Sequence, residues 1–190
     1  LANLKKSQLH NARGRAVNLS KAVLDGAQLR STTLQEAILT DASFVTADLT
    51  DADLTGATAT GIILTGARCD RAKLPVGLNF DGCDLSKASL CGCNLSGVSI
   101  VGADLSGCNL ESTILTNAIC TGANFEGAEM KHVQLEGADL TSANMKEARL
   151  DSAIMTNAIC TSANFEGAQM AKAQLEGADL TSANMKEAQL

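Results

Sequence analysis

Apolar residues recur every five positions along almost the whole chain. From Leu4 to Leu74 every fifth residue except Gly14 is apolar, and after one extra residue the series resumes at Phe80 and continues to Leu190. Of these 38 central positions 37 are apolar, and 27 of the 38 positions two residues earlier are Ala. A helix buries a residue about every 3.6 positions and a strand about every 2, so neither explains the period. The period predicts a solenoid in which a short extended segment and a tight turn return the chain to the interior every five residues.

The composition agrees with a narrow interior. The chain contains four Phe, no Trp and no Tyr, although 45% of its residues are hydrophobic, and every Phe and every Met lies at a central position. The remaining positions are rich in Asp, Asn, Ser, Thr, Gly and Lys, the residues that turns favour. Gly mostly follows the central residue by two positions, where we expect a corner that needs a permissive backbone.

Several five-residue strings carry a family resemblance. They are ADLTD at 47–51, ADLTG at 52–56, ADLSG at 103–107, ANFEG at 123–127 and ADLTS at 138–142. These strings resemble the A(D/N)LXX signature of the pentapeptide-repeat family, and the resemblance covers essentially the whole chain. It implies an all-β fold, the right-handed quadrilateral β-helix, in which four repeats make one coil. Residues 20 apart would then stack, and the 38 repeats would give about 9.5 coils and a rod roughly 45 Å long.

The repeat continues through one interruption, so we expect a single domain over residues 1–190. Its first register covers residues 1–74, a corner with one added residue covers 75–79 (PVGLN), and its second register covers 80–190. The corner contains the only Pro of the chain. Two interpretations stay open: a seam between two arrays, or a short recognition loop.

An internal duplication lies in the second register. Residues 116–150 recur at 156–190 with six differences in 35, and the offset of 40 would preserve every stacking face. The chain begins at Leu1 and ends at Leu190 within a repeat, which we interpret as an excised array or a processed product. Solenoids generally need polar caps, and none is visible here, so we expect either end-to-end association into a homo-oligomer or caps that are missing from this array.

Stacking predicts rows of side chains along the rod. Two rows alternate in charge, with Glu126, Lys146, Glu166 and Lys186 in one and Glu111, Lys131 and Asp151 in the other. A third row is a hydroxyl ladder of Thr121, Thr141, Thr161 and Thr181, and a fourth comprises Asp84, Asp104, Asn124, Asn144, Asn164 and Asn184. Opposite charges one coil apart should pair, although exposed pairs contribute only ~0–1 kcal/mol each.

The charge is unevenly distributed along the chain. Residues 1–74 carry nine Lys and Arg against seven Asp and Glu, a net charge of +2, whereas residues 75–190 carry six against fourteen, a net charge of −8. The resemblance suggests a DNA mimic, because some family members that protect bacterial topoisomerase from quinolones resemble a duplex in shape and charge. A mimic needs rows of a single sign, whereas the rows here alternate, and the long loops and helical tail of some such proteins are missing. We expect no direct nucleic-acid binding.

The sequence offers no catalytic, cofactor-binding or metal-binding residues. His10 and His132 follow central positions, so we expect both to be solvated and about six coils apart. The seven Cys include no CxxC pair and no Cys/His cluster, and only Cys91 should point outward. We expect inert buried thiols, which favour a reducing compartment such as the cytoplasm. No apolar run is long enough to span a membrane, so we expect no membrane insertion by this segment.

Four isoleucines are the candidate partner surface. Ile114 and Ile119 occupy outward positions on adjoining faces, and Ile154 and Ile159 repeat them two coils on. They form either a partner-binding stripe or ordinary surface side chains of a strand-like segment. The sequence therefore predicts a non-catalytic scaffold that binds a protein partner. The alternatives are a gyrase-binding DNA mimic and an accessory domain of a larger effector or membrane protein.

Overall fold

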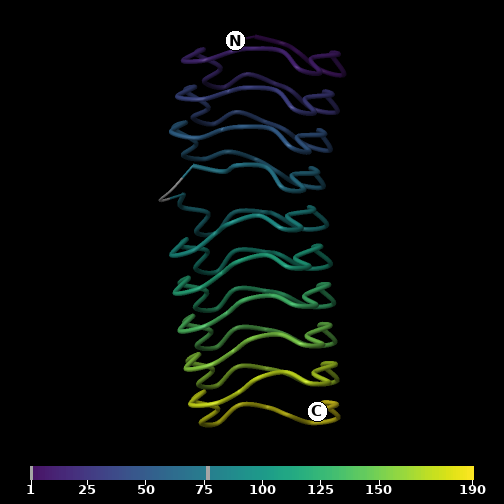
Figure 1. Cartoon of the computed structure of the whole chain (residues 1–190), viewed down its shortest axis with the longest axis vertical. Coiled ribbons are helices and arrows are strands. Elements are labelled where there is room, and N and C mark those ends of the chain that lie inside the picture. Colours follow the sequence, from purple (N-terminus) through teal and green to yellow (C-terminus); the bar gives the residue numbers. More distant parts are fainter. Residues whose placement is uncertain (1, 76–77) are drawn as a thin grey trace.

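The coils of the chain stack along one axis, with the N-terminal coil at one end and the C-terminal coil at the other (Figure 1). A computed structural model describes residues 2–75 and 78–190. These residues contain no helix and no extended strand, and isolated parallel bridges pair the backbone instead. The bridges run from Asn3↔Val23 to Gln169↔Gln189, and all but one join residues 20 apart. This is the offset that four repeats per coil would produce.

Each repeat contributes one bridging residue that faces outward between two residues that face inward. Asn124 bridges the coils on both sides, to Asp104 and to Asn144. Its neighbours Ala123 and Phe125 are 0% exposed. The Asn124 amide donates to the Ala103 carbonyl at 2.9 Å, and the Phe125 amide donates to the Asn144 carbonyl at 2.7 Å. One repeat therefore bonds in both directions along the axis with only two residues.

A tight turn closes every repeat. After Phe125, the Ala128 amide donates to the Phe125 carbonyl at 3.0 Å, and Gly127 has a φ of 63°. A left-handed residue at this position is what a type II turn requires. The predicted use of Gly at the corners is confirmed, but all described corners are left-handed, including Thr46 with a φ of 54°. Stacking, not Gly alone, therefore sets the corner conformation.

The interior is a column of mostly Ala and Leu side chains, with Phe and Met at some central positions. Buried hydrophobic residues extend from Ala22 to Met170 without a break in the stack. Gly14, the one central position that is not apolar, leaves little empty space. A Cβ there would lie 3.2 Å from both Leu34 Cδ2 and Val17 Cγ1, because these neighbours occupy the space that a central Leu would take.

The interruption at 75–79 changes the stacking offset. Val76 and Gly77 lie outside the described residues, whereas Pro75 and Leu78 on either side are buried. The bridge that crosses the interruption joins Arg68 to Ser89, which are 21 residues apart. Backbone bonds hold this side together, for example from the Arg71 amide to the Cys91 carbonyl at 2.9 Å. Within the described ranges, no backbone bond joins residues 72–75 to 92–95.

Candidate functional site

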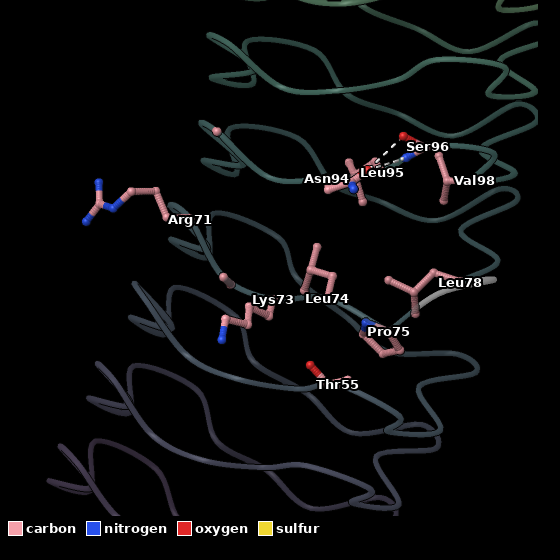
Figure 2. Close-up of a pocket in the computed structure, with 12 residues that line it drawn as sticks. Thr55, Arg71, Lys73, Leu74, Pro75, Leu78, Asn94, Leu95, Ser96 and Val98 are labelled. Carbon is pink, nitrogen blue, oxygen red and sulfur yellow. Dashed lines mark hydrogen bonds between the residues drawn. The ribbon is translucent and has the colours of Figure 1, made fainter.

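A groove of about 440 Å³ opens where the backbone ladder is interrupted (Figure 2). Its apolar lining includes Leu74, Pro75 and Leu78 from one coil and Leu95 and Val98 from the next. The groove exists because the added residue prevents the two coils from pairing along this side. The sequence predicted a bulged corner here but not a groove, and the single insertion was the only signal that could have indicated one.

The polar lining of the groove offers no catalytic group. Arg71 and Lys73 lie at its rim, and both are already paired: Arg71 Nε lies 2.9 Å from Asp51, and Lys73 Nζ lies 3.7 Å from Asp53. Asn94 accepts hydrogen bonds from the Ser96 amide and hydroxyl, as the dashed lines in Figure 2 show. The described lining residues include no carboxylate, thiol or imidazole. Lys73 is paired with Asp53 and the Ser96 hydroxyl donates to an amide oxygen, so neither has the orienting base that an activated nucleophile needs.

The four candidate isoleucines lie in two adjoining rows. Ile119 and Ile159 are 46% and 44% exposed, whereas Ile114 and Ile154 are half-buried. Ile114 and Ile154 both bridge to Gln134, which lies between them, and Asp139 separates Ile119 from Ile159 in the same way. The candidates are thus spaced two coils apart within each row, with a polar side chain in each interval. Their role in binding stays a prediction.

The alternating charged rows form some of the predicted ion pairs. Lys146 Nζ lies 3.3 Å from Glu166, and Lys131 Nζ lies 3.9 Å from Asp151. The hydrogen bond from Lys146 and its positive charge lower the pKa of the Glu166 carboxyl. Lys186 pairs at 3.7 Å with the adjacent Glu187, not with Glu166 as stacking alone suggested. The surface along these rows is therefore charge-compensated.

The row of Asp and Asn side chains forms a hydrogen-bonded ladder. The donors are Asn124, Asn144, Asn164 and Asn184, each of which donates from Nδ2 to Oδ1 of the residue one coil earlier, at distances of 2.9–3.1 Å. Oδ1 of Asn144 also accepts the Lys146 backbone amide at 3.2 Å, and the other rungs repeat this bond. Each side-chain amide thereby accepts a hydrogen bond from the backbone N–H of a corner and joins two neighbouring coils.

The hydroxyl ladder of threonines bonds outside its own row. Thr121 Oγ1 donates to Asp139 at 3.2 Å, and Thr161 Oγ1 donates to Asp179 at 3.1 Å. The threonines therefore bond to carboxylates of the neighbouring row and not to one another. Hydrogen bonds from Thr141 and Thr121 lower the pKa of Asp139 despite its partial burial. A carboxylate, whose two charged oxygens both accept hydrogen bonds, is the better acceptor for a nearby hydroxyl.

The thiols are not activated. Five cysteines are buried, and burial raises the pKa of Cys93, Cys108, Cys120 and Cys160 to about 12. Cys91 is half-buried, and desolvation together with Asp70 and Glu111 raises its pKa. Cys83 is half-buried too, but it takes the inward position two residues before Leu85 and packs against the core, so it is not a second outward thiol. Cys83 lies in the first coil after the interruption, where cover from the preceding coil is reduced.

The two histidines lie on the surface and far apart. His10 and His132 are both exposed, as expected, and His10 Nε2 lies 3.1 Å from Gln8 Oε1. Across residues 2–75 and 78–190, no group of three His, Cys, Asp or Glu side chains is placed to hold a metal ion. The same ranges contain no helix with the length and apolar character to cross a membrane.

Comparison with known proteins settles the family. The model of pentapeptide repeats matches residues 1–35, 27–66, 77–117, 118–157 and 158–190, in eight copies. The chain belongs to the pentapeptide-repeat family. No curated protein sequence matches it significantly. The family describes a repeat and not a class of enzyme, and it confirms the right-handed β-helix expected from the sequence.

Solved structures of this family resemble the pentapeptide-repeat chain along most of its length. HetL, from the cyanobacterium Nostoc sp. strain PCC 7120 and involved in the regulation of heterocyst differentiation, is 32% identical, with a TM-score of 0.70. The alignment covers 100% of this chain and 87% of HetL. Two trypsin-treated forms of QnrB1, a plasmid-mediated fluoroquinolone resistance protein, are 18% and 19% identical with TM-scores of 0.54 and 0.55. They cover 89% and 90% of this chain and 77% of QnrB1, and show the shared fold.

Proposed function

We propose that this pentapeptide-repeat chain is a non-catalytic scaffold whose flat sides bind a protein partner. The observation that carries the proposal is the exposure of aliphatic side chains on a rod whose interior is filled. Ile119 and Ile159 are each more than two-fifths exposed. The duplication repeats the same outward position after 40 residues. Such recurring exposed apolar groups favour a partner interface. Ile114 and Ile154 extend this candidate surface to the adjoining row.

Replacing Ile114 and Ile154 together by Asp tests this surface. The double variant should lose capture of a protein partner, because two carboxylates would enter an apolar contact. Ile63→Asp is the matched control, since Ile63 is 44% exposed but lies in another row. Capture would be compared quantitatively between the variants, with circular dichroism to verify the fold. Equal capture by all three proteins would remove these isoleucines from the binding surface.

A second candidate is a DNA mimic that binds gyrase. The net charge of −8 over residues 75–190 and the fold shared with QnrB1 favour it. The paired rows oppose it, because Lys131 and Lys146 interrupt the negative charge that a mimic presents. A supercoiling assay with purified gyrase decides: no inhibition at micromolar protein would eliminate the mimic. An accessory role within a larger effector or membrane protein is the third candidate, and the flanking reading frame tests it.

We further propose that residues 1–190 form one domain of about 9.5 coils with a quadrilateral cross-section. The 20-residue offset of the bridges and the four rows of bridging residues support this arrangement. The hydrogen bonds around Arg68 and Ser89, which cross the interruption, support a single domain over two separate ones.

A further inference from the structure

Exposed aliphatic side chains gather on one side of the rod. Apart from Leu190, the large exposed hydrophobic residues among those described are Ile38, Ile63, Val101, Ile119 and Ile159. Three of them occupy one row, whose members are Asn18, Ile38, Thr58, Asn79, Ser99, Ile119, Asp139, Ile159 and Asp179. Thr58 and Asn79 do not bridge, and we continue the row across the interruption from the 21-residue offset between Arg68 and Ser89 of the same two coils. Val101 lies in the corner row directly beside it. We call these two rows the isoleucine face.

The isoleucine face is built from short side chains that are already hydrogen-bonded. Its corner row is Ser20, Thr40, Thr60, Asp81, Val101, Thr121, Thr141, Thr161 and Thr181. Neither row contains Lys, Arg or Glu. The Asp81 carboxylate accepts the Ser99 hydroxyl at 2.6 Å and the Val101 amide at 2.8 Å. Covering such a face with protein leaves few polar groups without a partner and immobilises few long side chains.

The aliphatic residues are placed symmetrically about Ser99. Ile38 lies three coils before Ser99 and Ile159 lies three coils after it, about 14 Å away on each side at the usual strand spacing. A two-fold axis through this level, perpendicular to the rod, exchanges the two positions. In an antiparallel pair of rods, Ile38 of each copy would therefore face Ile159 of the other. Val101, which is 38% exposed, would lie beside the axis and meet its own counterpart.

The charges at the two ends of the face agree with the same arrangement. Arg15 and Lys21 flank the row four coils before Ser99, and Glu176 and Asp179 lie four coils after it. The two-fold axis brings these groups opposite each other. It also sets residues 1–74, with a net charge of +2, beside about residues 125–190, which carry a net charge of −5. A parallel pair would place the two acidic regions side by side and be opposed by repulsion.

We propose that two copies of this chain associate side by side and antiparallel through the isoleucine face, with Val101 at the two-fold axis. The second copy is the occupant because the charges at the two ends of the face are complementary between antiparallel copies, and its coils repeat at the same spacing except between Thr58 and Asn79, which do not bridge. This inference rests on the proposed scaffold function and deepens it by assigning one side of the rod to a second copy. Ile114 and Ile154, in the adjoining row, stay available to another protein.

Sedimentation equilibrium of the 190-residue chain and two variants tests the proposal. We expect the wild type to have twice the chain mass of 19.6 kDa at roughly 100 µM. Ile159→Asp should raise the dimer Kd at least about tenfold, because it places a carboxylate against Ile38 of the second copy. The matched control Ile63→Asp should change the Kd by less than about twofold, since this equally exposed residue lies outside the face. A monomeric wild type, or equal weakening by both variants, would overturn the proposal.

A cysteine at the axis tests the orientation. Val101→Cys should form a disulfide-linked dimer under mild oxidation and Ile159→Cys should not, because the antiparallel arrangement joins the two Val101 positions but sets Ile159 against Ile38 of the second copy, whereas a parallel pair would set both positions against their own counterparts. The wild type, with its seven native cysteines, is the control and should stay unlinked. Absence of the link in a Val101→Cys dimer would overturn the antiparallel arrangement.

Two further outcomes separate this inference from the scaffold proposal. Suppose that Ile159→Asp sediments as a monomer and that only the double variant Ile114→Asp, Ile154→Asp loses partner capture. The dimer face and the partner surface are then independent, and both proposals stand. A wild-type dimer that Ile159→Asp leaves intact would instead indicate end-to-end association and refute the isoleucine face. That result would leave the scaffold proposal unaffected.

Discussion

The N-terminal array (residues 2–75) and the C-terminal array (residues 78–190) share one backbone plan but differ in how their outer surfaces join neighbouring coils. Ion pairs between coils occur in both arrays, for example Arg71–Asp51 at 2.9 Å in the first and Lys146–Glu166 at 3.3 Å in the second. A ladder of asparagine amides runs along the second. The bridge offset is 20 residues in both. The fold therefore depends on the interior and the corners, and the outer rows are free to diverge toward function.

The largest expected effect concerns whether the two arrays unfold together. Phe44 and Phe165, one in each array, are both 0% exposed. Replacing either by Ala should cost about 3–5 kcal/mol through lost burial and a cavity. If one domain spans the interruption, chemical denaturation will show a single transition that either variant lowers. Two transitions, each shifted by only one variant, would mean that the arrays are independent units.

The asparagine ladder should matter more than the same row in the first array. Asn144 takes part in four hydrogen bonds, including Nδ2 to Asn124 Oδ1 at 2.9 Å, whereas Ser43 donates once, to Asp25 at 2.5 Å. Asn144→Ala should lower the free energy of unfolding by about 1–2 kcal/mol, and Ser43→Ala by about 0.5–1 kcal/mol. Urea titrations of both variants measure the difference. A larger loss for Ser43→Ala would show that the ladder is not what stabilises the second array.

Introducing a corner glycine in the first array and removing one from the second should change the stability in opposite directions. Thr46, a β-branched residue with a φ of 54°, is strained, and Thr46→Gly should stabilise the protein by about 0.5–1 kcal/mol. Gly127 has a φ of 63° and open space around its Cβ position, so Gly127→Ala should cost a similar amount through backbone strain alone. Thermal unfolding of both variants gives the signs. A destabilising Thr46→Gly would mean that the Thr46 hydroxyl bond to the Val45 carbonyl outweighs the strain.

The smallest expected effect is the response to acid. Hydrogen bonds from Thr141 and Thr121 lower the pKa of Asp139, so the unfolded chain binds its proton more readily than the folded one. The stabilisation is complete above the unfolded value of about 3.9 and is lost as the pH falls toward the lower folded pKa. Asp139→Asn should therefore flatten the decline in stability below about pH 4. An unchanged pH profile would assign acid sensitivity to other carboxylates, such as Asp53 in the first array.

The interior could be predicted from the sequence almost completely, and the outer rows only in part. The five-residue period placed Phe125 and Ala123 inside and Asn124 outside, because burial follows directly from repeat position. The asparagine ladder followed from the 20-residue offset. Thr121 was assigned to its row, but its acceptor was not predicted, since Asp139 lies in the neighbouring row of the coil. Contacts around a corner depend on side-chain direction, which a repeat pattern does not contain.

The sequence by itself determined that the chain is a pentapeptide-repeat solenoid with a filled interior, because a period of five leaves no other way to bury its apolar residues. Tertiary structure decided which outer residues meet. Ile38 and Ile159, 121 residues apart, share one face only because a 21-residue step at the interruption keeps the rows aligned. The same step prevents pairing next to Pro75 and opens the groove. One inserted residue barely changes the five-residue pattern of the sequence. In the structure, however, it interrupts the backbone ladder between two neighbouring coils.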